Sequence, residues 1–322
     1  MIEIRDFTKE TLCEAVELFV HSFNDQRRKI PLIPERKALS SEISSALSKQ
    51  INRPGVSAYH DGLLAGYMVE TGVAETFMGK RTAFSLNLYS HCSVEFQKEW
   101  IYQKMYERLS GLWVERGYYT QVISFWAQDS VLLYTLFRLG FGMTHFDLLR
   151  DLSLPEDTGT DISIHRLDST EPLMSLYEEE PHYYRKAPLF WLIQRDERSK
   201  DKIEADGDVL AAFDGDEPVA YFHMKKNKAE TWLIADEETG CIAGAYAAEK
   251  YRNKGIGTLL LREAVAWAKE NGLKRLYVEG ESANIQGGNF WMKHFTPVVY
   301  SVRRCIDERI TDQKNPGFSN ED

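Results

Sequence analysis

The stretch Tyr251-Arg252-Asn253-Lys254-Gly255-Ile256-Gly257-Thr258 decides how the second half of this chain folds. Gly255 and Gly257 have no Cβ atom, so the backbone there can turn with positive φ and approach a bulky anion closely. A helix that begins near Thr258 leaves its first N–H groups without partners, and its dipole favours negative charge at that end. Arg252 and Lys254 add positive charge. The stretch therefore predicts a site for a phosphate-containing ligand at a helix N-terminus.

The residues that follow predict a helix from Leu259 to Lys269, because apolar side chains recur there at helical spacing. Gly272 comes next as a stop signal. The loop differs from a nucleotide P-loop, in which the lysine follows both glycines. It also differs from the dinucleotide fingerprint, which requires a third glycine. The phosphate ligand is therefore expected to be of another kind.

The motif R-x-x-G-x-G-T from Arg252 to Thr258, followed by two leucines, resembles the pyrophosphate loop of the GNAT acetyltransferases, which bind acetyl-CoA. The resemblance covers roughly residues 208–307. It identifies 241–247 as the strand before the loop and 276–280 as the strand after the helix, and it matches Asn284 to the asparagine of the next segment. It implies an α/β (α+β) fold, in which a mixed, mostly antiparallel twisted sheet is flanked by helices.

This resemblance also implies which residues bind acetyl-CoA as a co-substrate. Backbone N–H groups of the strand before the loop would polarise the thioester carbonyl. Asn284 would meet the cofactor arm or a catalytic water, although the same residue could be only the N-cap of the next helix. The expected cofactor contacts are Ala245, Tyr246, Ala247, Arg252, Asn253, Lys254, Gly255, Ile256, Gly257, Thr258, Asn284 and Trp291.

The mechanism implied by the resemblance is direct attack of a primary amine on the thioester. Many members of the family place a tyrosine, the acid for the leaving thiolate, where this chain has Trp291, and an indole cannot serve as a general acid. The candidates for proton transfer are Glu281, Tyr246 and Tyr300, with solvent as an alternative acid, because a thiolate has a pKa of about 8.5. The acceptor amine, a small molecule or a peptide, stays open.

Composition excludes other classes of protein. The chain has 322 residues, an apolar share of 43% and a formal net charge of −10, which disfavours nucleic-acid binding. We expect no membrane partner and a cytoplasmic location, since no apolar run approaches the length of a membrane span and the N-terminus does not resemble a signal peptide. The scattered cysteines form no pairs typical of metal sites, so we expect no metal. Nothing indicates the oligomeric state.

An internal repeat with an offset of about 153–154 residues predicts two tandem GNAT folds. Asp61-Gly62 and Asp214-Gly215 each predict a hairpin turn between apolar runs. Leu136-Phe137 and Phe290-Trp291 also correspond. We therefore expect a GNAT-like domain over 1–150, a linker over 151–161, a second domain over 162–310 and a flexible tail over 311–322.

The first copy lacks the phosphate loop. Its corresponding stretch, His91 to Trp100, has no glycine and carries Glu95 and Glu99, which would repel a pyrophosphate. We therefore interpret 1–150 as a degenerate copy, with the alternative that it binds a different acyl donor through another loop. The sequence favours an N-acetyltransferase that acts through the second copy. A non-catalytic acyl-CoA-binding regulatory module is the alternative.

Overall fold

The computed structural model describes residues 1–157, 159–192, 207–226 and 232–310. The chain forms two compact units, and each of them combines segments that are distant in the sequence. Unit 1 comprises 1–26, 36–143 and residues from Tyr300 onward, whereas unit 2 comprises 27–35 and 144–299. The predicted tail, 311–322, lies outside the described residues. Among those residues, no helix is both long and apolar enough to cross a membrane.

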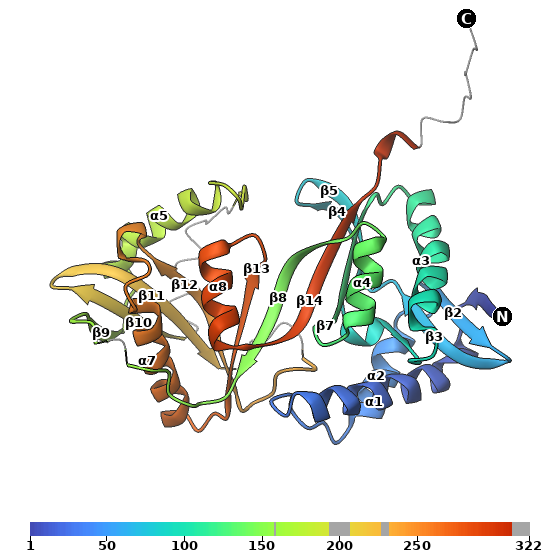
Figure 1. Cartoon of the computed structure of the whole chain (residues 1–322), viewed down its shortest axis with the longest axis horizontal. Helices are drawn as coiled ribbons and strands as arrows, with labels where there is room; N and C mark the ends of the chain where they lie inside the picture. Colours follow the sequence, from blue (N-terminus) through green and yellow to red (C-terminus); the bar gives the residue numbers. More distant parts are fainter. Residues whose placement is uncertain (158, 193–206, 227–231, 311–322) are drawn as a thin grey trace, which may run out of the picture. The chain divides into compact units, whose positions relative to one another are not determined.

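Unit 1 contains two sheets and the helices that pack on them (Figure 1). One sheet has the order β1-β2-β3-β6, and the strands β4, β5, β7 and β14 follow one another in the second. The strands are β1 (Ile2–Asp6), β2 (Gly55–His60), β3 (Leu63–Val69), β4 (Gly72–Phe77), β5 (Lys80–Ser85), β6 (His91–Ser93), β7 (Thr120–Trp126) and β14 (Thr296–Cys305). The helices are α1 (Leu12–Lys29), α2 (Leu39–Ser48), α3 (Lys98–Glu115) and α4 (Ser130–Arg138), of which α1 continues into unit 2.

Unit 2 is built on strands in the order β8-β13-β12-β11-β10-β9. Among the described strands of this unit, only β12 and β13 pair in parallel. The neighbours β8–β13, β12–β11, β11–β10 and β10–β9 are antiparallel. The strands are β8 (Gly142–Arg150), β9 (Ser163–Leu167), β10 (Asp208–Asp214), β11 (Glu217–Lys226), β12 (Thr239–Ala247) and β13 (Arg275–Glu281). The helices are α5 (Met174–Tyr184), α7 (Ile256–Glu270) and α8 (Ile285–His294). The predicted α+β class with mixed, mostly antiparallel sheets is confirmed.

Side-chain alternation places the helices of unit 2 on opposite faces of its sheet. Tyr221 and Tyr246 belong to the apolar cluster that contains Tyr177 of α5. Phe222 points to the other face, where its ring lies 5.4 Å from that of Trp291 in α8. The sheet therefore separates a face covered by α5 from a face covered by α8.

The last strand of each sequence copy contributes to the other copy's unit. From Thr144 onward β8 belongs to unit 2, where its register with β13 runs from Arg150 opposite Leu276 to His145 opposite Glu281. From Tyr300 onward β14 belongs to unit 1. The predicted boundaries at 150 and 161 thus follow the repeat in the sequence, and as domain limits they stay a prediction. The described part of 151–161 forms neither helix nor strand.

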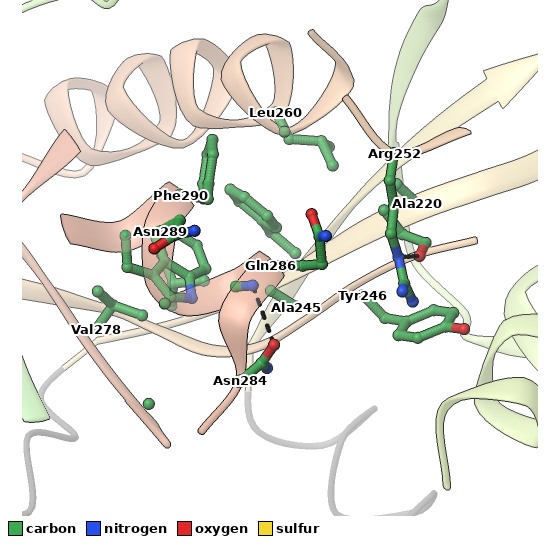
Figure 2. A pocket seen from close by; sticks show the side chains of 18 of the residues that line it. Ala220, Ala245, Tyr246, Arg252, Leu260, Val278, Asn284, Gln286, Asn289 and Phe290 are labelled. Atoms are coloured by element: carbon green, nitrogen blue, oxygen red, sulfur yellow. Dashed lines mark hydrogen bonds between the residues drawn. The ribbon is translucent and has the colours of Figure 1, made fainter. Parts of the chain in front are cut away.

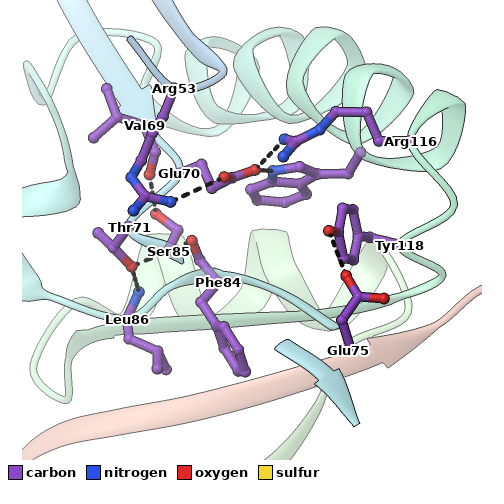
Figure 3. A network of polar contacts seen from close by, with 11 residues as sticks. Arg53, Val69, Glu70, Thr71, Glu75, Phe84, Ser85, Leu86, Arg116 and Tyr118 are labelled. Atoms are coloured by element: carbon purple, nitrogen blue, oxygen red, sulfur yellow. Dashed lines mark hydrogen bonds and ion pairs between the residues drawn. The ribbon is translucent and has the colours of Figure 1, made fainter. Parts of the chain in front are cut away.

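The buried carboxylate of Glu70 is paired with basic side chains of unit 1 (Figure 3). Glu70 is 1% exposed, and its Oε2 accepts hydrogen bonds from Arg116 at 2.6 Å and from the indole N–H of Trp113 at 3.0 Å. Arg53 lies 3.5 Å from its other oxygen. Because buried charges are costly unless they are paired and hydrogen-bonded, this network accounts for Glu70 as part of the fold.

Candidate functional site

The predicted phosphate loop turns sharply into α7. Gly255 is the N-cap residue with φ 84°, and Asn253 also has positive φ, 60°. The amide of Leu259 donates to the carbonyl of Gly255 at 3.0 Å, so the helix begins at Ile256, earlier than the predicted start near Thr258. The left-handed glycine makes this early start possible. The N–H groups of the first helical turn consequently point into the loop.

Arg252 connects the loop to the elements around it. Its Nε donates to the carbonyl oxygen of Ala247 at the end of β12, over 2.9 Å. Its guanidinium lies 4.1 Å from the ring centre of Tyr183 and 5.4 Å from that of Tyr246, as the close-up shows for Tyr246 (Figure 2). Arg252 therefore stabilises the arrangement of β12, the loop and α5, in addition to adding positive charge.

Gly257 allows α7 to approach α8 closely. A Cβ atom at this position would lie 3.1 Å from Cε2 and 3.2 Å from Cζ of Phe290, tighter than ordinary van der Waals contact. Any larger residue would therefore push the start of α7 away from α8.

The strands β12 and β13 separate in the middle of the sheet. Their parallel register ends with Ile242 opposite Val278. On its other side β12 has a bulge at Ala243, because the register with β11 shifts between the pairs Gly244–His223 and Ile242–Met224. A bulge bends a strand and disrupts its ladder. The two strands therefore diverge toward their carboxyl ends.

A cavity of about 690 Å³ opens in unit 2 where these strands diverge. It reaches from the start of α7 to His145 and Phe146 of β8 and to the carboxyl end of β13. Its lining includes most of the predicted site residues: Ala245, Tyr246, Ala247, Arg252, Asn253, Gly255, Ile256, Gly257, Thr258, Glu281, Asn284 and Trp291. Lys254 and Tyr300 are not part of the lining. Tyr300 falls in unit 1, where its ring packs 6.3 Å from that of Phe125.

Asn284 is the N-cap of α8. The sequence left this structural role open as the alternative to contact with the cofactor. Its Oδ1 accepts a hydrogen bond from the amide of Gly287 at 3.0 Å and another from the hydroxyl of Tyr183 at 2.8 Å (Figure 2 shows the first). The side chain also borders the cavity. Both hydrogen bonds use the oxygen, so they leave the amide nitrogen of the side chain to other partners.

Trp291 lies in an aromatic cluster. It is 7% exposed, and its ring centre lies 4.8 Å from that of Phe290 and 5.5 Å from that of Phe295. This environment fits a packing role against the cavity wall. It provides no hydroxyl at the position where the family often has a tyrosine.

The end of the cavity formed by β8 and β13 carries acidic side chains. Glu279 and Glu281 point to the α5 face, because Gly280 between them faces Trp291. His145 and Asp147 of β8 lie opposite Glu281 and Glu279 and share that face. His145 Nε2 is 3.5 Å from Glu279 Oε2. His145 and Glu279 were not among the predicted site residues: the alternation of His145 and Asp147 with apolar neighbours indicates a strand with one polar face, but not that this strand pairs with β13.

Burial and charge act against each other in this group. Burial lowers the pKa of His145, but the hydrogen bond to Glu279 and the charges of Asp147, Glu279 and Glu281 outweigh it, so the pKa is raised. Burial would raise the pKa of Glu279, yet His145 holds it below its usual value. Burial is the main reason that the pKa of Glu281 is raised. Glu281 therefore titrates nearer to neutral pH than an isolated carboxyl group does, whereas Glu279 titrates at a lower pH.

Three of these side chains have donor atoms within 4.8 Å of one another, close enough to hold a metal ion: His145, Asp147 and Glu279. The hydroxyl of Tyr277 already lies between the two carboxylates, 2.5 Å from Asp147 Oδ1 and 3.1 Å from Glu279 Oε2. These hydrogen bonds explain the proximity of the two carboxylates without an ion.

In unit 1, a lysine occupies the position that corresponds to the start of α7. Lys98 is the first residue of α3, and its Nζ lies 2.7 Å from Asp129 Oδ2 and 2.8 Å from Glu95 Oε1. Asp129 is the N-cap of α4, as Asn284 is of α8. The side chains of Lys98 and Asp129 are each 10% exposed. This ion pair links the starts of α3 and α4, and the interpretation of the first copy as degenerate stays a prediction.

Comparison with known proteins agrees with this geometry. Residues 170–295 match the Acetyltransferase (GNAT) family. Streptothricin acetyltransferase A of Bacillus subtilis (strain 168) is 47% identical over 47 residues, which are 15% of this chain and 27% of that protein. The chain therefore spans only about a quarter of the length of this relative.

Two solved structures share the fold at low sequence identity. A GCN5-related N-acetyltransferase from Sphaerobacter thermophilus has a TM-score of 0.51 and 13% identity, with 94% of this chain and 95% of that one covered. A glucosamine N-acetyltransferase region of a fungal GH3 β-N-acetylglucosaminidase has a TM-score of 0.52 and 14% identity, with 94% of this chain and 38% of that one covered. These two structures show the fold that this chain shares, and the match of residues 170–295 identifies that part of the chain as belonging to the Acetyltransferase (GNAT) family.

Proposed function

We propose that this protein is an acetyl-CoA-dependent N-acetyltransferase that acts through unit 2 and transfers the acetyl group to a primary amine by direct attack on the thioester. The observation that carries the proposal is the cavity, which joins a glycine-lined helix start to the opening between β12 and β13. One end of this cavity suits phosphates, and the other suits an amine.

The residues at the α7 end fit the pyrophosphate of coenzyme A. Gly255 has the left-handed conformation that turns the first helical amides toward the cavity, and Gly257 keeps the helix start close to α8. We assign the pyrophosphate to the amides of residues 255–258 and to the charge of Arg252. The backbone of Ala245, Tyr246 and Ala247 would hold the pantetheine arm and polarise the carbonyl. Acetyl-CoA supplies the activated acetyl group; the protein positions the amine and manages the protons.

The acidic end suits an amine that arrives as an ammonium ion. Glu281 borders the cavity there, and we assign to it the first contact with that ammonium group. Tyr246 also borders the cavity, and burial, assisted by Glu179, keeps the pKa of its hydroxyl above the ordinary value. It therefore stays protonated and able to donate a hydrogen bond. Streptothricin is a first acceptor to test, because a relative is described as acting on it.

The test measures thiol release from acetyl-CoA with a panel of amines, together with CoA binding by calorimetry. Gly255→Glu is expected to abolish CoA binding, because it places a carboxylate in the phosphate site. Gly272→Glu is the matched control, since Gly272 follows the other end of α7, also has positive φ (68°) and faces open space. Both variants strain the backbone by about 1 kcal/mol. Full CoA affinity in Gly255→Glu would show that the pyrophosphate binds elsewhere.

A second candidate function is a non-catalytic acyl-CoA-binding regulatory module, which the buried Trp291 in place of a hydroxyl residue favours. It predicts CoA binding without thiol release above hydrolysis for every amine in the panel. Turnover with any amine excludes it.

A further inference from the structure

The proposed reaction requires a group that takes a proton from the acceptor. A primary amine of the lysine type has a pKa of about 10.4, so it enters the cavity as an ammonium ion and cannot attack until it loses a proton. The most effective base has a pKa near the working pH. An imidazole meets this condition better than a carboxylate does.

His145 is the histidine at the acidic end of the cavity. It borders the cavity, and its side chain is 31% exposed, so part of it is accessible. The groups that face it are Glu279 and Glu281 of β13 and Asp147 of its own strand. The other histidine of the lining, His294, lies at the end of α8 near Thr258, where burial and, to a smaller extent, the nearby cations Lys293 and Arg150 lower its pKa. Only His145 of these two has carboxylates to stabilise its protonated form.

We propose that His145 is the general base of this reaction and that Glu279 holds its imidazole in place. This proposal rests on the proposed function. The base comes from the last strand of the first sequence copy, because β8 pairs with β13 in unit 2. The degenerate copy would thus supply a catalytic residue for the copy that binds the cofactor.

The proton balance of the step is complete. Neutral His145 takes one proton from the ammonium group and becomes an imidazolium ion beside Glu279 and Glu281. The amine nitrogen then forms a bond to the thioester carbon, and the C–S bond breaks with its electron pair on sulfur. The nitrogen releases a second proton, which the thiolate gains to give free CoA. His145 finally returns its proton to solvent.

The first measurement does not depend on activity. The imidazole resonance of His145 is identified in the full chain by NMR as the one lost in His145→Gln, and its pKa is then followed. We expect a pKa above 6.5 that falls in Glu279→Gln. A pKa at or below 6.5, or one that Glu279→Gln leaves unchanged, would overturn the proposal.

The second measurement is the pH profile of kcat/KM for the best amine of the panel, with EDTA present to remove adventitious metal. His145→Gln should lower kcat at least 100-fold, remove the rising limb and leave CoA affinity unchanged. Glu279→Gln should move the limb to lower pH. His165→Gln, an exposed histidine on β9, is the matched control and should match the wild type.

The outcomes separate this proposal from the proposed function. An unchanged limb in His145→Gln, with a wild-type enzyme that turns over, refutes the role of His145 alone. If Glu281→Gln removes the limb instead, Glu281 is the base. Absence of turnover in the wild type with every amine refutes the proposed function, and the role of His145 falls with it.

Discussion

Asn284 offers a direct way to separate a structural role from contact with the cofactor. Its Oδ1 caps α8 through Gly287 and accepts the hydrogen bond from Tyr183. Loss of an N-cap costs about 1 kcal/mol, and loss of a hydrogen bond of this kind costs about 1 kcal/mol. Asn284→Ala should therefore lower the free energy of unfolding by about 2 kcal/mol, measured by urea titration.

Asn284→Asp is the informative partner of this variant. Aspartate is as good an N-cap as asparagine, and its oxygen can still accept from Tyr183. The stability should therefore stay within about 0.5 kcal/mol of the wild type. The variant does lose the amide N–H donors and adds negative charge beside the cavity. If Asn284 contacts the cofactor, CoA should bind at least tenfold more weakly, as measured by calorimetry.

Two results would refute this reasoning. A loss of less than 0.5 kcal/mol in Asn284→Ala would show that the cap and the Tyr183 contact contribute little. Unchanged CoA affinity in a stable Asn284→Asp would show that Asn284 is only a cap. Tyr183→Phe serves as a control for the shared hydrogen bond, and it should account for about half of the loss in Asn284→Ala.

Three further predictions follow from single contacts. Gly257→Ala should weaken CoA binding about tenfold, because its Cβ would lie 3.1 Å from Phe290. In the control Gly111→Ala, in α3, the added Cβ meets nothing within 4 Å, so this variant should stabilise the protein slightly. Equal CoA affinity in the two variants would contradict this explanation. Asp129→Asn keeps the N-cap of α4 but removes the charged partner of Lys98. We expect the free energy of unfolding, measured by urea titration, to fall by about 1–3 kcal/mol. An unchanged free energy of unfolding would mean that the ion pair contributes nothing. Because the pKa of Glu279 is lowered in the folded state, its ionised carboxylate contributes to the free energy of unfolding above pH 4.5, and this contribution is lost as the pH falls through the lower folded pKa. The free energies of unfolding of the wild type and of Glu279→Gln should therefore converge in acid. A difference in stability that persists there would refute the ion-pair explanation.

The phosphate loop and its neighbours could be predicted because their signals are local. Two glycines before an apolar helical pattern predicted the start of α7 within a few residues, and the left-handed φ of Gly255 is the conformation that its lack of a Cβ allows. The Asp-Gly pairs similarly predicted the hairpins β2–β3 and β10–β11, which are confirmed. These features depend on residues that are close together in the sequence.

The acidic end of the cavity could not be predicted in the same way. The alternation from Gly142 to Arg150 is typical of a strand, but it does not determine which strand is its neighbour. The corresponding strands of the two copies, β8 and β14, both suit a place beside a central strand. Long-range packing determines which of these two strands joins each unit. The sequence pattern therefore did not predict that His145 lies in unit 2 and Tyr300 in unit 1.

We propose that the first copy is degenerate, and this exchange of strands explains why unit 2 still depends on it. Residues 91–100, which correspond in the repeat to the phosphate loop, lie in unit 1, and none of them lines the cavity in unit 2. The strand β8, in contrast, is part of the core of unit 2. Phe146 packs so closely on Gly280 that a Cβ there would lie 2.8 Å from its ring, and Leu148 and Leu149 are fully buried. Substitutions in β8 therefore damage unit 2 directly, through its core at Phe146 and, as we propose, through its chemistry at His145.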